Sequence, residues 1–201
     1  KVNLVFNNAG AALNGRFDQT GLDDFDWQMN VNFGGVLNGT KAFLPILEQS
    51  EWGHIHNISS IFGIIAAPGN SAYNASKFAV RGMTECLRIE LKQSGSNVSC
   101  STVNPGGVKT NVVRNARSAH GNTFIGGKTH DEMIEGFDEV AKTTPEKAAK
   151  IILDGTAKNK KRILVGMDAK IIDKIQRFFP TLYFPIMQKT FGWGKDLMDE
   201  S

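Results

Sequence analysis

The regular alternation of short apolar runs with longer segments of helical periodicity is what most limits the fold of this chain. Four runs have the length of strands buried within a sheet, at residues 2–6, 54–60, 97–107 and 162–166. Segments with helical spacing of apolar residues lie between them, at 22–47, at 73–93 and after Thr144, where Pro145 occupies the first helical position. Strands that alternate with helices form a parallel sheet with helices on both faces. We therefore predict an α/β fold with a doubly wound parallel sheet.

The chain opens directly on one of these predicted strands. Residues 2–6 are almost continuously apolar, which indicates a strand buried on both faces, and residues 7–10 form the turn that closes it. Strands of that kind are interior to a sheet. A chain that opens on one is expected to be a sequence cut out of something longer.

Composition restricts the class of protein. The 201 residues and 41% hydrophobic content suit one domain with a substantial core. A net charge of +3, with no basic stripe, argues against nucleic acid as a partner. The two cysteines lack metal-ligand spacing, and His54 and His56 have no third ligand nearby, so no metal site is expected. A reduced, cytoplasmic protein is the natural interpretation.

Polar or glycine-rich motifs stand at the carboxyl ends of three of the predicted strands. They read NNAG at 7–10, SS at 59–60 and NPGG at 104–107. In open parallel sheets, ligands bind beyond the carboxyl ends of the strands. A tight turn explains each motif taken singly, but their common position at one edge of the sheet indicates a ligand site.

Tyr73 and Lys77 are four residues apart at the start of a predicted helix, so their side chains share one face. A phenol titrates near pH 10, and a nearby ammonium favours the phenolate and lowers that pKa. Ser60 lies thirteen residues before Tyr73, at the end of a predicted strand, where its hydroxyl could meet the same substrate oxygen. Tyr73 and Lys77 alone would be read as an ordinary surface pair. Together with Ser60 at this spacing, they predict that Tyr73 acts as an acid or base catalyst.

Together, NNAG, SSIFG followed by YNASK, and NPGGVKT resemble the short-chain dehydrogenase/reductase family over residues 7–110. The resemblance implies a Rossmann-type sheet and an NAD or NADP cofactor. It makes Tyr73 the proton donor or acceptor at the substrate oxygen, and Ser60 the residue that holds that oxygen. Lys77 would bind the nicotinamide ribose and lower the pKa of Tyr73, and the backbone carbonyl of Asn32 would hold a water in the proton relay. A structural role for Asn32, bonded to its own helix, is the alternative.

The resemblance also implies a cofactor-binding surface. The residues that would contribute to it are Asn7, Ala9, Gly10, Tyr73, Lys77, Pro105, Gly106, Val108 and Thr110. In this family the strand that ends in NNAG is the fourth. The chain would thus lack the glycine-rich phosphate turn and the residue that selects NAD or NADP, so the choice of cofactor is open and the 201 residues alone are expected to be inactive.

The expected activity is interconversion of an alcohol and a ketone or aldehyde by hydride transfer, with a lipophilic substrate favoured by the apolar stretch after Ser60. A non-catalytic regulatory or binding protein, and an epimerase or dehydratase, are the alternatives. We expect one domain over 1–201, with a cofactor and catalytic core at 1–110, a substrate loop at 111–143, a last helix and strand at 144–167 and an amphipathic tail at 168–201.

The tail carries a predicted apolar stripe, formed by Ile171, Ile172, Ile175, Phe178, Phe179 and Leu182, beside the basic residues Lys170, Lys174 and Arg177. Packing over the substrate pocket or against another subunit is favoured, with a homodimer or homotetramer as the expected assembly. Peripheral contact with a membrane is the alternative.

Overall fold

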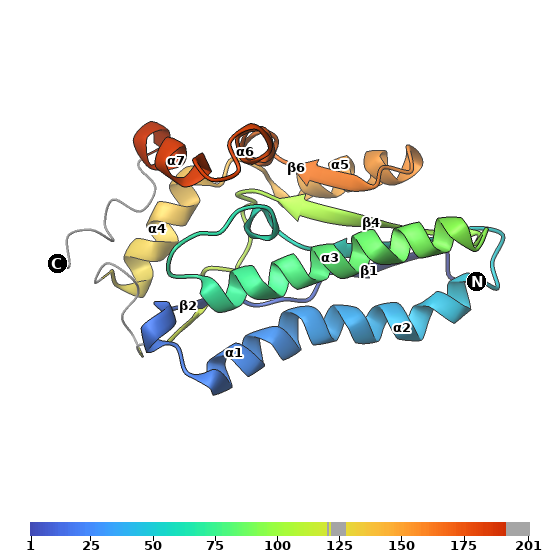
Figure 1. Cartoon of the computed structure of the whole chain (residues 1–201), viewed down its shortest axis with the longest axis horizontal. Coiled ribbons are helices and arrows are strands. Elements are labelled where there is room, and N and C mark those ends of the chain that lie inside the picture. The colour runs from blue at the N-terminus through green and yellow to red at the C-terminus, as the bar shows by residue number, and fades with distance from the viewer. Residues whose placement is uncertain (120, 122–127, 192–201) are drawn as a thin grey trace.

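A computed structural model, which describes residues 1–119, 121 and 128–191, contains a four-stranded parallel sheet (Figure 1). Parts of the predicted substrate loop and tail, at residues 120, 122–127 and 192–201, lie outside the described residues. The strands are ordered β1-β3-β4-β6, with bounds β1 Leu4–Asn7, β3 Gly53–Ile58, β4 Val98–Pro105 and β6 Arg162–Val165. Their register places Val5 beside Ile55 and Ile55 beside Cys100. All four predicted strands are therefore present.

Helices cover both faces of the sheet. In Figure 1, α2 (Gly35–Leu47) and α3 (Ser71–Gln93) lie on one side, and α5 (Pro145–Ala157) lies on the other. One core cluster packs Val5, Ile55 and Cys100 against the helices of the first side, and another packs β4 and β6 against α5. The Thr144 hydroxyl accepts a hydrogen bond from the Lys147 amide, which caps α5 where Pro145 predicted its start. The predicted doubly wound α/β fold is thus confirmed.

The segment predicted as one long or broken helix is one long helix whose hydrogen-bond pattern changes in its middle. α1 (Leu22–Met29) is continued by a π-helical turn, Asn30–Gly34, and then by α2. The amide of Gly35 bonds the carbonyl of Asn30, five residues back. Such a bulge changes the direction of the carbonyls and side chains locally, and it is common at functional sites.

The helix α3 ends on a left-handed glycine. Gly95 has φ +69°, and the Ser96 amide reaches back to the Leu91 carbonyl at 3.0 Å. This is the bond pattern that satisfies the last carbonyls of a helix, and a residue with a Cβ adopts the required φ only at a cost. The termination fixes where β4 begins.

The first strand differs from the prediction that both its faces are buried. Val5 is 9% exposed and belongs to the core, whereas Phe6 is 44% exposed. β1 is at the edge of the sheet, and Phe6 stacks on His56 of β3 with ring centroids 4.7 Å apart. Because α5 lies over the far strands β4 and β6, it leaves Phe6 only partly covered.

Two features of the structure were not predicted. Within the supposed substrate loop, α4 (His130–Val140) begins with a capping box in which the Thr129 and Glu132 side chains bond each other's backbone amides. The short strands β2 (Leu13–Asn14) and β5 (Arg117–Ser118) form a second parallel pair.

The tail forms α6 (Met167–Phe178) and α7 (Tyr183–Phe191). The predicted single stripe is divided between two faces: Ile172 is buried with Ile64, Ile65 and Met187, while Phe178 is 76% exposed. Ile171 and Ile172 point about 100° apart on a helix, so they cannot share one narrow face. Among the described residues, no helix is both long and apolar enough to cross a membrane.

Candidate active site

The motifs predicted to form a site meet at the edge where the parallel strands end. Ala9 and Gly10 follow β1 and are exposed, and Ser60 follows β3. Gly10 lies where two other predicted site residues converge: a Cβ at this position would be 3.1 Å from Asn32 Oδ1 and 3.4 Å from Lys77 Nζ. The absence of a side chain at Gly10 therefore lets the backbone after β1 lie close to these two buried groups.

Asn32 is fully buried in the π-helical turn and joins three parts of the site. Its Oδ1 accepts a hydrogen bond from the Ala11 amide at 2.9 Å, and its Nδ2 donates to the Ala11 carbonyl and to Ser76 Oγ, each at 3.0 Å. The side chain does not bond its own helix, which was the structural alternative. The neighbouring Asn30 is exposed, so only Asn32 faces the site.

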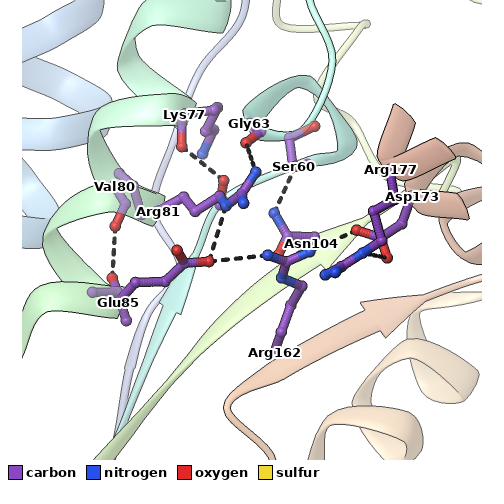
Figure 2. A network of polar contacts seen from close by, with 12 residues as sticks. Ser60, Gly63, Lys77, Val80, Arg81, Glu85, Asn104, Arg162, Asp173 and Arg177 are labelled. Atoms are coloured by element: carbon purple, nitrogen blue, oxygen red, sulfur yellow. Dashed lines mark hydrogen bonds and ion pairs between the residues drawn. The ribbon is translucent and has the colours of Figure 1, made fainter. Parts of the chain in front are cut away.

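Ser60 is held by its backbone at the end of β3, as Figure 2 shows. Its carbonyl accepts a hydrogen bond from Asn104 Nδ2 at 2.8 Å, and its hydroxyl oxygen accepts one from the Phe62 amide at 3.1 Å. The adjacent Ser59 is turned inward, where its hydroxyl donates to the Lys77 carbonyl at 2.8 Å. Ser60 is thus the serine whose side chain lies toward Tyr73.

Tyr73 and Lys77 share the first turns of α3, as predicted. Lys77 Nζ lies 5.6 Å from the centroid of the Tyr73 ring and donates to the Ile58 carbonyl at 3.1 Å. Burial lowers the pKa of Lys77 to about 8. This shift makes the charge of Lys77 depend on pH near neutrality.

The predicted lowering of the Tyr73 pKa by Lys77 is not found. Burial raises the pKa of Tyr73 above its ordinary value, and the hydrogen bond with the Ser60 side chain only opposes that rise. The physical reason is that the phenolate loses its hydration when α3 packs against the strand ends. In this arrangement Tyr73 holds its proton, and Ser60 is the side chain that favours the phenolate.

Two predicted cofactor residues have their side chains in the interior. Asn7 Nδ2 donates to Asn57 Oδ1 at 2.8 Å and to Thr40 Oγ1 at 3.1 Å, which turns the side chain toward α2. Val108 is 9% exposed and packs in the cluster between the sheet and α5. Each side chain is oriented by its neighbours in the core, and contact of these two residues with a cofactor stays a prediction. Their backbones remain at the strand ends.

Asp168, at the start of α6, was missed by the sequence analysis. Its Oδ2 accepts a hydrogen bond from the Gly107 amide at 2.6 Å, and a Cβ at Gly106 would collide with its carboxylate. Gly166, with φ +104°, makes the turn that brings Asp168 back over the NPGG segment. The residue lies in the first turn of the helix that follows the fourth strand, so the strand-end rule that selected the other three motifs could have found it.

We expect the variant Asp168→Ala to lose about 1.5–3 kcal/mol of unfolding free energy, the usual contribution of a hydrogen bond to a charged group. Urea unfolding measures this. The matched control is Asp154→Ala, because Asp154 is exposed and pairs with Lys150 only at 3.5 Å. That change should cost less than about 1 kcal/mol. Equal losses in the two variants would contradict the role given to Asp168.

The two histidines of β3 form a separate buried pair. Their rings stack at 4.5 Å, His54 Nε2 is 2.7 Å from Ser101 Oγ, and His56 Nε2 is 2.9 Å from Thr156 Oγ1. Burial lowers the pKa of His54 to about 3, helped by nearby His56 and Arg88, and lowers the pKa of His56 to about 4. The described part of the chain contains no group of three or more potential ligands for a metal ion.

The parallel sheet with its polar strand ends, and the group Ser60, Tyr73 and Lys77, define a Rossmann-type α/β protein with a site at the carboxyl edge of the sheet. The sequence model of the short chain dehydrogenase family matches residues 1–121. The chain therefore belongs to the short-chain dehydrogenase/reductase family of oxidoreductases.

Individual relatives agree with this assignment. The chain is 46% identical over 199 residues to SadH of Mycobacterium tuberculosis, which is named as an oxidoreductase; the match covers 96% of this chain and 70% of SadH. It is 33% identical to dehydrogenase/reductase SDR family member 7B of Xenopus laevis, over 93% of this chain and 55% of that protein. The chain thus spans just over half the length of this second relative.

Solved structures of the family have the same fold. A short-chain dehydrogenase/reductase from Burkholderia phymatum in complex with NAD superposes with a TM-score of 0.78 at 28% identity, covering 90% of this chain and 67% of that one. A short-chain dehydrogenase from Burkholderia cenocepacia in complex with NADP gives 0.65 at 25% identity, covering 93% and 68%.

Proposed function

We propose that this chain carries the catalytic half of an NAD(P)-dependent oxidoreductase that interconverts an alcohol and a ketone or aldehyde. The observation that supports it best is the convergence of Ser60, Tyr73, Lys77 and Asn32 at one strand edge, beside the exposed backbone of Ala9 and Gly10. The two solved relatives described as bound to NAD and NADP support a nicotinamide dinucleotide without deciding between the two.

Within this proposal, Tyr73 is the acid that delivers a proton to the substrate oxygen during reduction, and takes it back during oxidation. A phenol with a raised pKa holds its proton until a stronger base is beside it, which suits it to protonate a developing alkoxide. Ser60, in contact with the same phenol, would hold the substrate oxygen in reach. Asn32 positions the turn at Ala11 and the start of α3.

The residues present fit a dinucleotide. Lys77 Nζ has three N–H donors and one bond to the Ile58 carbonyl, so donors remain for the hydroxyls of a ribose. Ala9, Gly10, Pro105, Gly106 and Thr110 are proposed to contact the dinucleotide at the strand ends. When bound, the nicotinamide would supply or accept the hydride, which the side chains of this chain cannot do.

A lipophilic substrate is proposed because of the surface around the loop that follows Ser60. That loop is apolar and buries Ile61, Ile64 and Ile65 against the tail. A pocket of about 760 Å³ opens between this loop, residues 16–18 and α7. Phe17, Pro68 and Phe184 form the apolar part of its walls, and Arg16, Asp18, Ser71 and Asn74 form the polar part. Aromatic and apolar walls favour an apolar substrate body over a sugar.

We also propose a homodimer or homotetramer. The support is a set of exposed apolar side chains on α2 and α3, namely Phe43, Ile46, Phe78 and Ile89.

The test is nucleotide oxidation by the native protein with a panel of long-chain and aromatic ketones and aldehydes beside sugars. Loss of the nicotinamide absorbance measures turnover, and quenching of protein fluorescence measures cofactor binding separately. We expect turnover with apolar carbonyl compounds and with one of NADH or NADPH. Saturable nucleotide binding with no turnover of any carbonyl or alcohol would instead favour a binding protein on the same fold.

A further inference from the structure

An apolar stripe lies on the solvent side of α6, where a helix of a soluble domain is normally polar. Met167, Ile171 and Phe178 are 67%, 41% and 76% exposed, and they are spaced to fall on one side of the helix. The stripe continues through Phe179 and Leu182, which are 49% and 56% exposed. Scattered apolar residues are ordinary at a surface, but a contiguous patch marks an interaction site.

The opposite side of α6 is firmly attached to the protein, so the stripe cannot be turned inward. Ala169 is fully buried and Ile172 is 5% exposed. Asp173, 7% exposed, accepts from Arg162 at 2.6 Å and from Arg177 at 2.8 Å, and Arg162 also bonds Glu85 of α3 at 3.2 Å. Figure 2 shows this network joining α3, β6 and α6. It fixes the rotation of the helix about its axis.

The same network determines the charge of the outward face. Both carboxylates of α6 interact with groups of the protein itself. Asp173 forms ion pairs with the two arginines, and Asp168 accepts a hydrogen bond from the Gly107 amide. Lys170 and Lys174 are exposed beside the stripe. The outward face therefore combines large apolar side chains with ammonium groups.

We propose that the stripe of α6, with Phe179 and Leu182, docks on an anionic phospholipid membrane. Aromatic and aliphatic side chains enter the headgroup region while the lysines pair with lipid phosphates or carboxylates, which is how interfacial helices bind. A second copy of the chain fits less well, because a twofold contact through this face would oppose Lys170 and Lys174 of one copy to those of the other. Leu182 directly precedes Tyr183 and Phe184, which line the pocket described above, so the docking surface is continuous with the pocket wall.

The experiment is sedimentation of the native protein with vesicles of phosphatidylcholine alone and with phosphatidylserine added. We expect binding only to the vesicles that contain phosphatidylserine. The double variant Lys170→Gln/Lys174→Gln should lower the partition coefficient about 25-fold, because one basic residue near an anionic surface is worth about 1 kcal/mol, or about fivefold. The double variant Ile171→Gln/Phe178→Gln should reduce binding at least as much.

Matched controls come from α5, where Lys147 and Leu153 are exposed in the same way. Lys147→Gln and Leu153→Gln should leave vesicle binding unchanged. All the substituted side chains are exposed, so circular dichroism should report an unchanged fold. Equal losses in the α5 variants would overturn the proposal, as would absence of vesicle binding. A change in sedimentation coefficient on Ile171→Gln/Phe178→Gln, with vesicle binding retained, would identify the face as a contact between copies instead.

Discussion

Replacing Tyr73 by phenylalanine is expected to lower kcat by at least about a hundredfold and to leave the dissociation constant of the nucleotide nearly unchanged. The change removes one oxygen, and with it the proton that the proposed mechanism delivers to the substrate, while the ring still fills its place beside Lys77 and Phe62. Positioned acid or base catalysis is typically worth about 10²–10⁴-fold. Turnover and fluorescence titration, measured on the same preparation, separate the two effects.

The other tyrosine of the chain gives the matched control. Tyr183 accepts a hydrogen bond from the Ala66 amide at 3.0 Å and lies on the pocket wall, away from Ser60 and Lys77 in the sequence and in its contacts. Tyr183→Phe should change KM more than kcat. A Tyr73→Phe variant that keeps more than about a tenth of the wild-type kcat would remove Tyr73 from its proposed role.

Acidification is expected to destabilise the protein strongly before its carboxylates are protonated. His54 and His56 have folded-state pKa values of about 3 and about 4, below the value near 6.5 of an unfolded chain. Between these pKa values the two histidines are protonated in the unfolded state but neutral in the folded state. Their contribution to the free energy of unfolding is therefore complete above pH 6.5 and is lost as the pH falls. The loss is about 2.7 kcal/mol per pH unit while both histidines differ between the two states.

Urea unfolding between pH 7 and about pH 4.5 measures this loss of unfolding free energy. We expect it to reach about 5 kcal/mol. The total unfolding free energy of a typical domain is about 5–15 kcal/mol. His56→Gln should halve the pH slope. His130→Asn is the control, because His130 begins α4 and lies outside the sheet. A slope that is the same in the wild type and in His56→Gln would show that burial of these rings does not control acid stability.

The elements of the fold were predictable because their signals are local. Pro145 after Thr144 marks the start of α5, and the apolar run at 162–166 becomes β6. The capping box from Thr129 to Glu132 is just as local and predicts the start of α4, although the segment around it has the composition of a loop. Periodicity also does not determine which side of an amphipathic helix faces the protein, so the sequence pattern places Ile172 and Phe178 in one stripe although the structure separates them.

The site was predictable in its membership and less so in its electrostatics. The spacing from Ser60 to Tyr73 and from Tyr73 to Lys77 is a property of the sequence, and these side chains do lie together. The raised pKa of Tyr73 depends on how far the phenol is removed from water, which only the packing of α3 determines. Asp168 could be selected by its place after a strand, but its bond to the Gly107 amide, 61 residues away, follows from no spacing rule.

The loop after Ser60 is covered by residues made much later during synthesis. Its Ile64 and Ile65 pack against Ile172 and Met187, and the Ala66 amide donates a hydrogen bond to the Tyr183 hydroxyl. Strands β1, β3 and β4 can pair once residue 105 has left the ribosome. At translation rates of about 5–20 residues per second, the isoleucines then remain uncovered for roughly ten seconds. During that interval three of the four strands can pair while the apolar loop after Ser60 is still exposed, and exposed apolar surface of this kind makes a nascent chain prone to aggregate.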